Sequence, residues 1–453
     1  MNPASATTGP AVPPVASGST PVLGHALRLL RDPLGFVESL RQDGDVVRVK
    51  AGPKTIYAIT APGLVELLLL RHGPSLVIGG PFWETLEDIL GKGVATSNGA
   101  AHRRQRRIIQ PLFRPDRVSE YTAVMTEEAQ AMAERWEPGQ VVDIAAELFT
   151  TVVRIVSRSL LDVPSIGRRA DEIGIALHTV FAGMYRRMVL PAKVLYRVPT
   201  RSNRRFDRAL ATLHRITDEI IAERRGSGQD HDDLLGTLLA ARDEQGRPLP
   251  ETEIHDNILS IIVGGSETVA STLSWTFWLL SEHPELEKRL HEEADAEVAT
   301  PGPINPSAIS YTRDLVYEAM RIRPAAWIFT RRATADIELD GHRIPAGSDI
   351  VYSTYALQRD GRSFDRPLEF DPSRWHPDRA APASKAAMMP FGIGNRKCPG
   401  DHFSVAETAI IVAAVTSRWR LRPVAATDAS TRIDITLHPA RLLLKAEPRS
   451  YSS

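Results

Sequence analysis

The chain has 453 residues, of which 43% are hydrophobic and 24% charged, the composition of a globular protein that folds without disulfides. Its formal net charge is zero at pH 7, whereas a nucleic-acid-binding protein normally carries a basic excess. The single cysteine, Cys398, excludes an intrachain disulfide and any zinc or iron–sulfur site that needs several cysteines.

The N-terminus shows no sign of a membrane segment or an export signal. The first 40 residues contain no apolar run near the roughly 18 to 20 residues that span a bilayer. They also lack the charged start and short apolar core of a secretory signal. We therefore expect a soluble cytoplasmic protein in a reducing compartment, with no membrane span.

The N-terminal half begins with an irregular segment and continues with a hairpin and helices. Residues 1–20 are rich in Pro, Ala, Ser and Thr, which predicts a disordered tail. Residues 45–50 and 55–60 are β-branched segments separated by a Gly-Pro turn, which predicts a β-hairpin. From residue 103 to about 225 the pattern is mostly helical, with apolar residues at three- and four-residue spacing.

The C-terminal half combines long helices with short strands. Helices are predicted over 251–281 and 403–419. Short strands joined by Gly and Pro turns are predicted between 336 and 352, and strand-like alternation ends the chain over 431–445. Because helical and strand-rich parts interleave, we expect one large α+β unit rather than several domains.

The stretch around Cys398 is the most informative part of the sequence. Residues 391–400 read FGIGNRKCPG, with three glycines around the cysteine. Glycine permits a positive φ and close approach of the backbone to a ligand, so such a loop can bring N–H groups near the sulfur and hold it as a thiolate. A thiolate beneath a flat cofactor is a haem-iron ligand. The alternative is a lone buried cysteine that behaves as a small hydrophobe.

The loop resembles the haem-binding loop of the cytochrome P450 family. The residues that carry the resemblance, with the neighbouring Gly392, are Phe391, Gly394, Arg396, Cys398 and Gly400. The resemblance implies that Cys398 ligates the iron of haem b, that Phe391 packs beside the sulfur and that Arg396 pairs with a haem propionate. It spans residues 21–446, leaving tails at 1–20 and 447–453. It implies the P450 fold, mainly α with small β-sheets (α+β), with the haem between the long helix and the cysteine loop.

A second motif lies upstream of the loop. Glu318 and Arg321 are three residues apart on one predicted helix face, a spacing that by itself is usually a weak surface pair. Their place before Cys398, with Arg374 between, resembles the Glu-x-x-Arg pair and the second arginine of P450s. The resemblance implies a structural role for these three residues in a buried ion network.

The predicted helix over 251–281 contains Gly264 and Gly265, each of which costs roughly 1 kcal/mol relative to Ala in a helix. Close helix packing is one explanation. The other is that a flat group lies against the helix, with local unwinding that admits a small ligand. The resemblance implies the latter, an oxygen-binding groove followed by a catalytic acid–alcohol pair, Glu267 and Thr268. Val269 stands where many family members have a second Thr or Ser.

Propionate partners are also implied by the resemblance. His102 and Arg106 lie four residues apart and match the family's helix pattern, although a solvated face is the alternative for such an Arg-rich helix. Arg331 matches an arginine on a strand after the Glu-x-x-Arg helix, with the adjacent Arg332 as the alternative.

The resemblance implies an apolar substrate pocket, although residues of this kind are also common in cores. The candidates by position in the family fold are Phe82, Trp83, Leu86, Phe181, Met184, Met188, Ile261, Ile262, Ala325, Trp327 and Ile328.

The implied activity is that of a monooxygenase, which inserts one oxygen atom from O₂ into a C–H bond. Electrons would come ultimately from NAD(P)H through a separate ferredoxin and ferredoxin reductase, because one cysteine cannot hold a cluster. We expect the ferredoxin to dock on a basic face formed by Arg103, Arg107 and Lys397. We expect a monomer that binds no nucleic acid.

The substrate and the class of activity leave alternatives open. The pattern Pro21, Gly24 and His25 resembles bacterial P450s that oxidise cyclic terpenes in secondary metabolism, while macrolides (polyketides) and fatty acids remain possible substrates. A non-oxidising haem-binding protein for recruitment or sensing is an alternative of another class. The acidic run over 230–233 suggests a magnesium-dependent prenyl-diphosphate enzyme, but a surface loop with a helix-capping Asp is the better interpretation.

Overall fold

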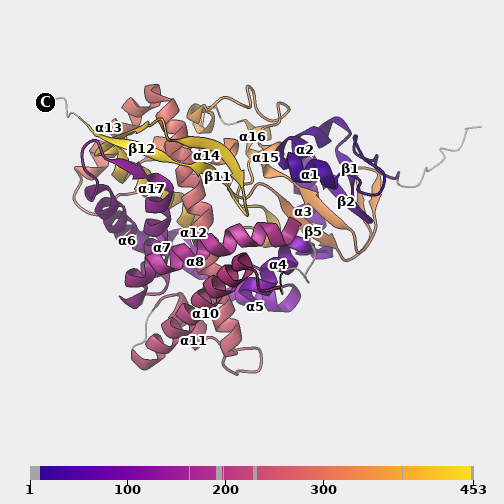
Figure 1. The fold of residues 1–453 in the computed structure, drawn as a ribbon, viewed down its shortest axis with the longest axis horizontal. Helices are drawn as coiled ribbons and strands as arrows, with labels where there is room; N and C mark the ends of the chain where they lie inside the picture. Colours follow the sequence, from indigo (N-terminus) through magenta and orange to yellow (C-terminus); the bar gives the residue numbers. More distant parts are fainter. Residues whose placement is uncertain are drawn as a thin grey trace, which may run out of the picture. The chain divides into compact units, whose positions relative to one another are not determined.

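The computed structural model describes residues 11–162, 164–189, 196, 198–227, 232–379 and 381–449. The chain divides into two compact units whose segments interleave along the sequence. Unit 1 comprises Met1–Glu84, Trp327–Leu368 and Ala381–Cys398, and unit 2 comprises Thr85–Ala326, Glu369–Ala380 and Pro399–Ser453. Figure 1 shows the helices and strands of both units. Mainly helical structure with small sheets confirms the predicted α+β class.

Unit 1 is organised around a five-stranded sheet of order β1-β2-β8-β5-β3. Strands β1 and β2 form an antiparallel hairpin, β2 and β8 run parallel, and the remaining pairs are antiparallel. The strands are β1 (Val46–Ala51), β2 (Lys54–Ile59), β8 (Asp349–Tyr352), β5 (Phe329–Ala333) and β3 (Leu76–Val77). The hairpin predicted over residues 45–60 is confirmed.

The other elements of unit 1 are a short β-ribbon and helices. The ribbon pairs β6 (Ile337–Leu339) with β7 (His342–Ile344). The helices are α1 (Ala26–Arg31), α2 (Pro33–Ser39), α3 (Pro62–Arg71), α15 (Thr354–Leu357) and α16 (Pro382–Ala387). Helix α4 (Pro81–Leu90) begins in unit 1, and its residues from Thr85 onward belong to unit 2.

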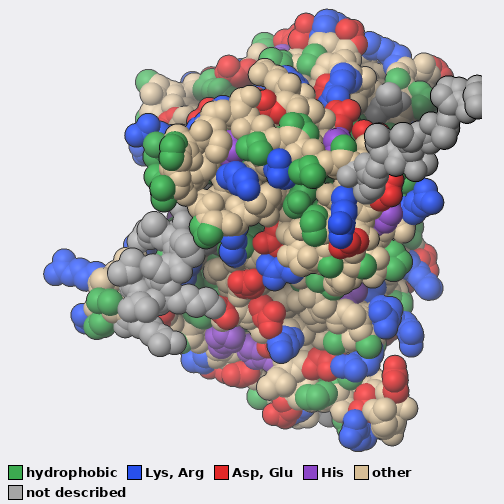
Figure 2. Space-filling model, turned by 90° about the vertical axis from the view of Figure 1, so that its right-hand side faces the viewer, with side chains coloured by type: hydrophobic (Ala, Val, Ile, Leu, Met, Phe, Trp, Pro, Cys, Tyr) green, Lys and Arg blue, Asp and Glu red, His purple; other side chains and the backbone are tan. Residues whose placement is uncertain are grey.

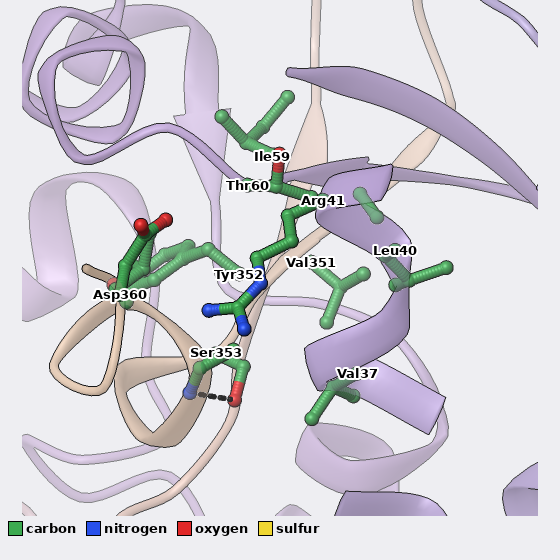
Figure 3. Close-up of a pocket in the computed structure, with 12 residues that line it drawn as sticks. Val37, Leu40, Arg41, Ile59, Thr60, Val351, Tyr352, Ser353 and Asp360 are labelled. Atoms are coloured by element: carbon green, nitrogen blue, oxygen red, sulfur yellow. Dashed lines mark hydrogen bonds between the residues drawn. The ribbon is translucent and has the colours of Figure 1, made fainter. Parts of the chain in front are cut away.

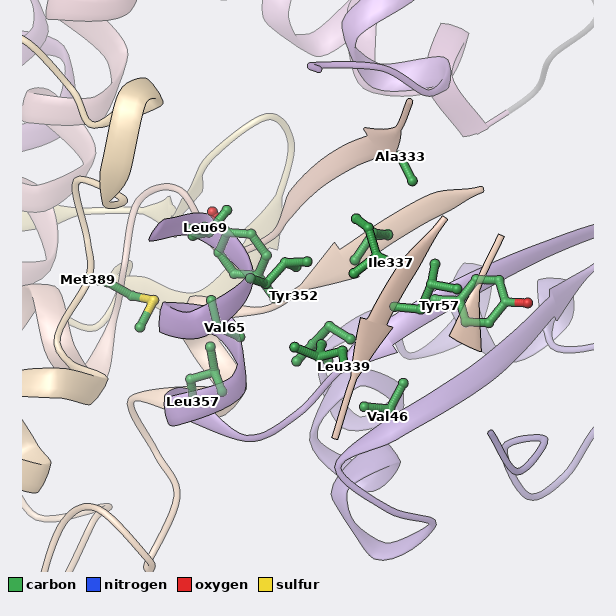
Figure 4. Packing of buried hydrophobic residues seen from close by; sticks show 14 residues of the cluster. Val46, Tyr57, Val65, Leu69, Ala333, Ile337, Leu339, Tyr352, Leu357 and Met389 are labelled. Carbon is green, nitrogen blue, oxygen red and sulfur yellow. The ribbon is translucent and has the colours of Figure 1, made fainter. Parts of the chain in front are cut away.

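The core of unit 1 forms where α3 packs on strand residues (Figure 4). Val65, Leu68 and Leu69 recur at the three- and four-residue spacing of a helix face, and all three are almost fully buried. They pack in one cluster with Ile350 and Tyr352 of β8. Burial of this apolar face is what holds α3 on the sheet.

The structure differs from the expected tail boundaries at both ends. Ala11 forms a β-bridge with His342, and Val15 forms one with Arg48, so residues 11–20 belong to unit 1 rather than to a disordered tail. Residues 1–10 lie outside the described residues. At the other end the strand β12 continues to Pro448, and Arg449 pairs with Asp295 at 2.6 Å. The prediction of a disordered N-terminal tail is wrong for residues 11–20 because it rests on composition alone. Composition does not indicate that a Pro- and Ala-rich segment will pair with the edge of a sheet.

Unit 2 is mostly helical. Its long helices include α12, which packs against α7, and α17, which packs against α6 (Figure 1). The helices are α5 (Gly99–Ile109), α6 (Pro115–Glu134), α7 (Ile144–Leu160), α8 (Pro164–Val189), α10 (Arg201–Ser227), α11 (Leu234–Ala240), α12 (Glu251–Glu282), α13 (Glu287–Val298), α14 (Ser310–Ile322) and α17 (Asp401–Thr416). No helix in the described part of the chain is long and apolar enough to cross a membrane.

Unit 2 also contains a three-stranded sheet and a two-stranded hairpin. The sheet has the order β4-β12-β9, and the hairpin pairs β10 with β11. The bounds are β4 (Val141–Asp143), β9 (Trp419–Pro423), β10 (Asp428–Ile433), β11 (Leu437–Arg441) and β12 (Leu443–Pro448). The strand-like alternation predicted over 431–445 is therefore divided among three strands.

A buried ion network joins α14 to the segment after residue 368. The Glu318 carboxylate accepts hydrogen bonds from Arg321 at 2.8 and 2.9 Å and from Arg374 Nε at 3.2 Å. The Trp375 indole N–H and the Asp371 backbone N–H also donate to this carboxylate, both at 3.0 Å. The side chains of Glu318 and Arg321 are fully buried. The three predicted network residues thus come together, and Trp375 and Asp371 complete the set.

Replacing Arg321 with Ala would leave the Glu318 charge buried without its principal partner. We expect the free energy of unfolding to fall by about 3–5 kcal/mol, measured by urea denaturation followed by circular dichroism. The control is Arg313→Ala on the same helix, where the arginine side chain is 41% exposed. It should change the free energy of unfolding by no more than about 0.5 kcal/mol. Equal losses in the two variants would contradict the role of the network.

Candidate functional site

The loop around Cys398 is closed by its own backbone. The Cys398 N–H donates to the Phe391 carbonyl at 2.8 Å, so the two ends of the predicted motif meet. Within the loop, the Lys397 N–H donates to the Gly394 carbonyl at 3.1 Å, and the Gly392 N–H donates to the Met389 carbonyl at 3.0 Å. The side chain of Cys398 is partly exposed. The loop therefore fixes the backbone of Cys398 and leaves the residue partly exposed.

Two glycines of the loop are required by backbone geometry. Gly392 and Gly394 have φ angles of +65° and +75°, which other residues adopt only under strain. A Cβ on Gly394 would also lie 2.8 Å from the carbonyl oxygen of Leu69 in α3. The close approach of α3 and the left-handed turn thus both favour glycine at 394.

Arg331 is a buried cation in β5 of unit 1. Its side chain donates to the Thr330 carbonyl at 2.7 Å, and it forms no ion pair with any carboxylate of the described residues. The alternative, Arg332, is already paired with Asp349 at 2.7 Å and with Glu84 at 3.5 Å. A buried guanidinium without a carboxylate partner is suited to an anionic ligand. This favours Arg331 over Arg332 as the partner of a propionate.

The predicted pair on α5 lies one turn apart in unit 2. His102 is buried, and Arg106 is partly buried and donates from Nε to Gln110 at 2.9 Å. Arg104, between them, forms an ion pair with Glu253 of α12 at 2.6 Å. The side chains of Arg103 and Arg107 are exposed, so this helix has a buried face and a basic solvent face.

Helix α12 shows different surroundings for its two glycines. A Cβ on Gly265 would lie 3.3 Å from Val156 of α7, so close helix packing accounts for this glycine. A Cβ on Gly264 would meet nothing within 4 Å, so this glycine borders open space within unit 2. The predicted local unwinding is wrong, because α12 is continuous from Glu251 to Glu282. The Thr268 hydroxyl bonds back to the Gly264 carbonyl at 2.9 Å, which is compatible with an unbroken helix.

Glu267 is directed at the β10–β11 hairpin. Its carboxyl oxygen Oε1 accepts a hydrogen bond from the Thr436 hydroxyl at 2.9 Å. Burial raises the pKa of Glu267 by disfavouring the charged form, and Thr436 and His438 act in the opposite direction. Sequence reasoning missed this partner. Asp434 and Thr436 lie in the turn between β10 and β11, so no periodic pattern in the sequence indicates this contact.

The predicted pocket residues are largely buried where the structure describes them. Trp83 is anchored by its indole N–H, which donates to the Thr330 carbonyl at 3.2 Å, and its ring packs edge-on against Phe82 with centroids 4.9 Å apart. Six others are at most 8% exposed: Leu86, Phe181, Met184, Ile262, Ala325 and Trp327. Ile261 and Ile328 are partly buried, and the Met188 side chain lies outside the described residues.

A small cavity in unit 1 is not a candidate for the substrate site. It has a volume of about 20 Å³ and is lined by residues of α2, β2 and β8 (Figure 3). A space of this size holds about one water molecule. Acidic and basic side chains are interspersed over the face in Figure 2, in keeping with the zero net charge.

The acidic run over 230–233 does not form a metal site where it is described. Asp233 caps α11 and pairs with the buried Arg224 at 2.7 Å. Asp232 is largely exposed and pairs with Arg117 at 3.1 Å. Residues 230 and 231 lie outside the described residues, and the remainder contain no group of three side chains able to hold a metal ion. The helix-capping interpretation of Asp233 is confirmed.

Comparison with known proteins covers nearly the whole chain. The family model for cytochrome P450 matches residues 13–449. Cyclooctat-9-en-7-ol 5-monooxygenase of Streptomyces melanosporofaciens is 40% identical over 96% of this chain and 95% of its own length. Cyclooctatin synthase of the same organism is 38% identical over 96% and 95% of the two chains. Pentalenene oxygenase of Streptomyces avermitilis is 39% identical over 96% and 97%.

These matches and the cysteine loop agree. Membership in this family implies a haem whose iron is ligated by a cysteine thiolate, O₂ as co-substrate, an electron-donating partner and an apolar substrate. Cys398 is the one cysteine in the sequence and lies in the loop that carries the family motif. The chain therefore belongs to the cytochrome P450 family and is a haem-thiolate monooxygenase.

Proposed function

We propose that this P450 inserts one oxygen atom from O₂ into a C–H bond of a cyclic terpene. The observation that carries the proposal is similarity over nearly the entire chain to three enzymes named for cyclooctatin-type compounds and pentalenene. The apolar character of the predicted pocket residues supports it. A fatty acid or a macrolide would be an alternative substrate, but no observation on the described residues favours either.

Residues in each unit, taken separately, have the chemistry that a haem would need. Cys398 would ligate the iron, and Phe391, Gly392 and Gly400 would shape the loop around it. The open space beside Gly264, next to Gly265, supports contact of this part of α12 with a flat ligand. The cations that would bind the propionates are Arg331, Arg396, His102 and Arg106. Arg331 is the strongest candidate, because it is buried and pairs with no carboxylate in the part of the chain that the structure describes.

When bound, the haem would supply O₂ activation, and the protein would supply protons and orientation. Thr268 and Glu267 are the proposed catalytic residues. The Thr268 hydroxyl, placed one turn after Gly264, can hold a proton donor beside the ligand. Glu267 is a partly buried carboxyl whose raised pKa favours the protonated form that an acid must reach to donate.

Turnover of candidate substrates tests the proposal directly. Purified holoenzyme with ferredoxin, reductase and NADPH should convert polycyclic terpene hydrocarbons to mono-oxygenated products that carry ¹⁸O from ¹⁸O₂. Spectral titration should show displacement of the iron-bound water by the same compounds. Cys398→Ser is the control and should lose both signals. Oxidation of fatty acids or macrolides, with no binding or oxidation of terpenes, would contradict the terpene assignment.

Thr268→Ala should separate electron consumption from product formation. Loss of the hydroxyl removes a proton-holding group, so product formed per NADPH should fall by about tenfold or more while peroxide rises. Thr272→Ala is the matched control, because the Thr272 hydroxyl makes the equivalent bond one turn later, to the Thr268 carbonyl at 2.9 Å. Unchanged coupling in Thr268→Ala, or equal uncoupling in both variants, would refute the catalytic role.

We propose that the electron donor is an acidic ferredoxin that contacts the exposed Arg103 and Arg107 of α5 in unit 2. Lys397, exposed in the cysteine loop of unit 1, is proposed as a further contact. The electrons of the ferredoxin would come ultimately from NAD(P)H. The protein is further predicted to be cytoplasmic and monomeric. Opposite charges across an interface mainly accelerate association, and the effect weakens with salt.

The double variant Arg103→Glu with Arg107→Glu should lower ferredoxin-driven turnover about tenfold at low salt. Peroxide-driven turnover, which needs no docking, should stay unchanged. The control reverses Arg201 and Arg208, which are exposed on α10. Equal loss in the ferredoxin and peroxide assays would place the defect inside the enzyme and reject the docking site.

A further inference from the structure

The β10–β11 hairpin carries three polar residues that act on Glu267 of α12, Thr436 by direct contact and Asp434 and His438 by their charges. The Thr436 hydroxyl, only 1% exposed as a residue, donates to the Glu267 carboxyl at 2.9 Å. Two residues further along, His438 Nε2 lies 3.0 Å from the Asp434 carboxylate. Thus a partly buried acid, a hydroxyl and an ion pair belong to one cluster in unit 2. None of the three hairpin residues belongs to the family motifs identified above.

The hydrogen-bond partners of His438 define its charge. Nε2 faces the Asp434 carboxylate, and Nδ1 lies 3.1 Å from the Pro439 carbonyl oxygen. Both partners can only accept, since a carbonyl and an ionised carboxylate have no proton to donate. This arrangement favours a proton on each ring nitrogen, which is the imidazolium form of His438. Burial opposes this charge, but Asp434 and Glu267 outweigh it and raise the pKa of His438.

The hairpin is held firmly on α12. The Leu437 carbonyl accepts hydrogen bonds from the Ser271 hydroxyl at 2.6 Å and from the Trp275 indole N–H at 2.7 Å. The Leu437 N–H donates to the Ala325 carbonyl at 3.2 Å. Leu437 lies between Thr436 and His438 in the sequence, so these bonds fix the position of both residues relative to the Glu267 turn.

Several other charges surround the cluster. Arg432 of β10 approaches Asp434 at 3.4 Å. His178 of α8 interacts electrostatically with His438, Arg432 and Asp434, and with Arg205 of α10. Burial lowers the pKa of His178, and the neighbouring cations His438 and Arg432 lower it further. The charge that acts on Glu267 from the hairpin is thus divided between the cation His438 and the anion Asp434.

We propose that Thr436 and His438 are positioning residues for Glu267: the Thr436 hydroxyl orients the carboxyl, and the imidazolium of His438, held by Asp434, sets its charge. The inference rests on the catalytic role proposed above for Glu267. A carboxyl in a purely apolar site would stay protonated and could not cycle, whereas a nearby cation makes the ionised form accessible. The hairpin therefore provides the electrostatic partner that a buried catalytic acid needs.

The electrostatic coupling is measured by histidine side-chain NMR titration of the holoenzyme in its diamagnetic ferrous carbon monoxide form. His438→Gln identifies the signal. The pKa of His438 should lie above that of an ordinary histidine, and both Glu267→Gln and Asp434→Asn should lower it by removing a negative neighbour. Glu282→Gln is the control, an exposed position at the far end of α12, and should leave the pKa unchanged. An unchanged His438 pKa in Glu267→Gln would overturn the proposal.

Turnover provides the second measurement. In the pH–rate profile of turnover, one limb should report the ionisation of Glu267. Loss of the cation in His438→Gln should move this limb to higher pH, and His438→Arg should return it toward the wild-type position. Thr436→Val should lower the product formed per NADPH at least about threefold. Thr436→Ser, which keeps the hydroxyl, should recover most of this yield. The thiolate-type spectrum of the reduced carbon monoxide complex should be unchanged in all of these variants, which excludes a general defect.

The two proposals fail separately. If Glu267→Gln turns over like the wild type, its catalytic role is wrong, and the positioning role falls with it even when the NMR coupling is present. The positioning role alone is wrong if Glu267→Gln has impaired turnover while the Thr436 and His438 variants keep the wild-type pH–rate profile and product yield per NADPH.

Discussion

The closed loop between Phe391 and Cys398 is the constraint on which the rest of the activity depends. A backbone hydrogen bond of 2.8 Å joins its ends, and glycines at positive φ allow the turn between them. A lone cysteine is usually a small buried hydrophobe, but here Cys398 is partly exposed. Haem-thiolate chemistry requires such a fixed and accessible sulfur, because the protein contributes position and electronics while the cofactor contributes the oxidation.

Two kinds of partner stabilise buried polar side chains at particular places in unit 2. Glu318 gathers two arginines, an indole and a backbone N–H, so its charge is compensated in the absence of solvent. On α12, hydroxyl groups such as Thr272 and Thr276 bond to carbonyls one turn earlier. These local bonds let a long helix carry polar side chains through a core. Glu267 differs, because its hydrogen-bond partner, Thr436, comes from another element.

Glu267 therefore lies under two opposing influences. Burial favours its neutral form, while the Thr436 hydroxyl and the His438 charge favour the ionised form. The balance depends on contacts between α12 and the β10–β11 hairpin. The hydrogen bonds from Ser271 and Trp275 to the Leu437 carbonyl maintain these contacts. Catalytic acids in general need this kind of compromise, since an acid that is strongly held in one state cannot exchange a proton during turnover.

The sequence alone identified the family, the α+β class and the residues of its motifs, because the cysteine loop and the Glu318–Arg321 spacing are local patterns with fixed residue types. Helix and strand positions followed from periodicity for the same reason, as the 45–60 hairpin and the 251–282 helix show. Only the tertiary structure assigned Gly265 to helix packing and Gly264 to open space, kept α12 unbroken, and brought residues 11–20 into unit 1. It alone joined Glu267 to Thr436, which is 169 residues away, because a contact between distant elements depends on how they pack and leaves no periodic trace in either segment.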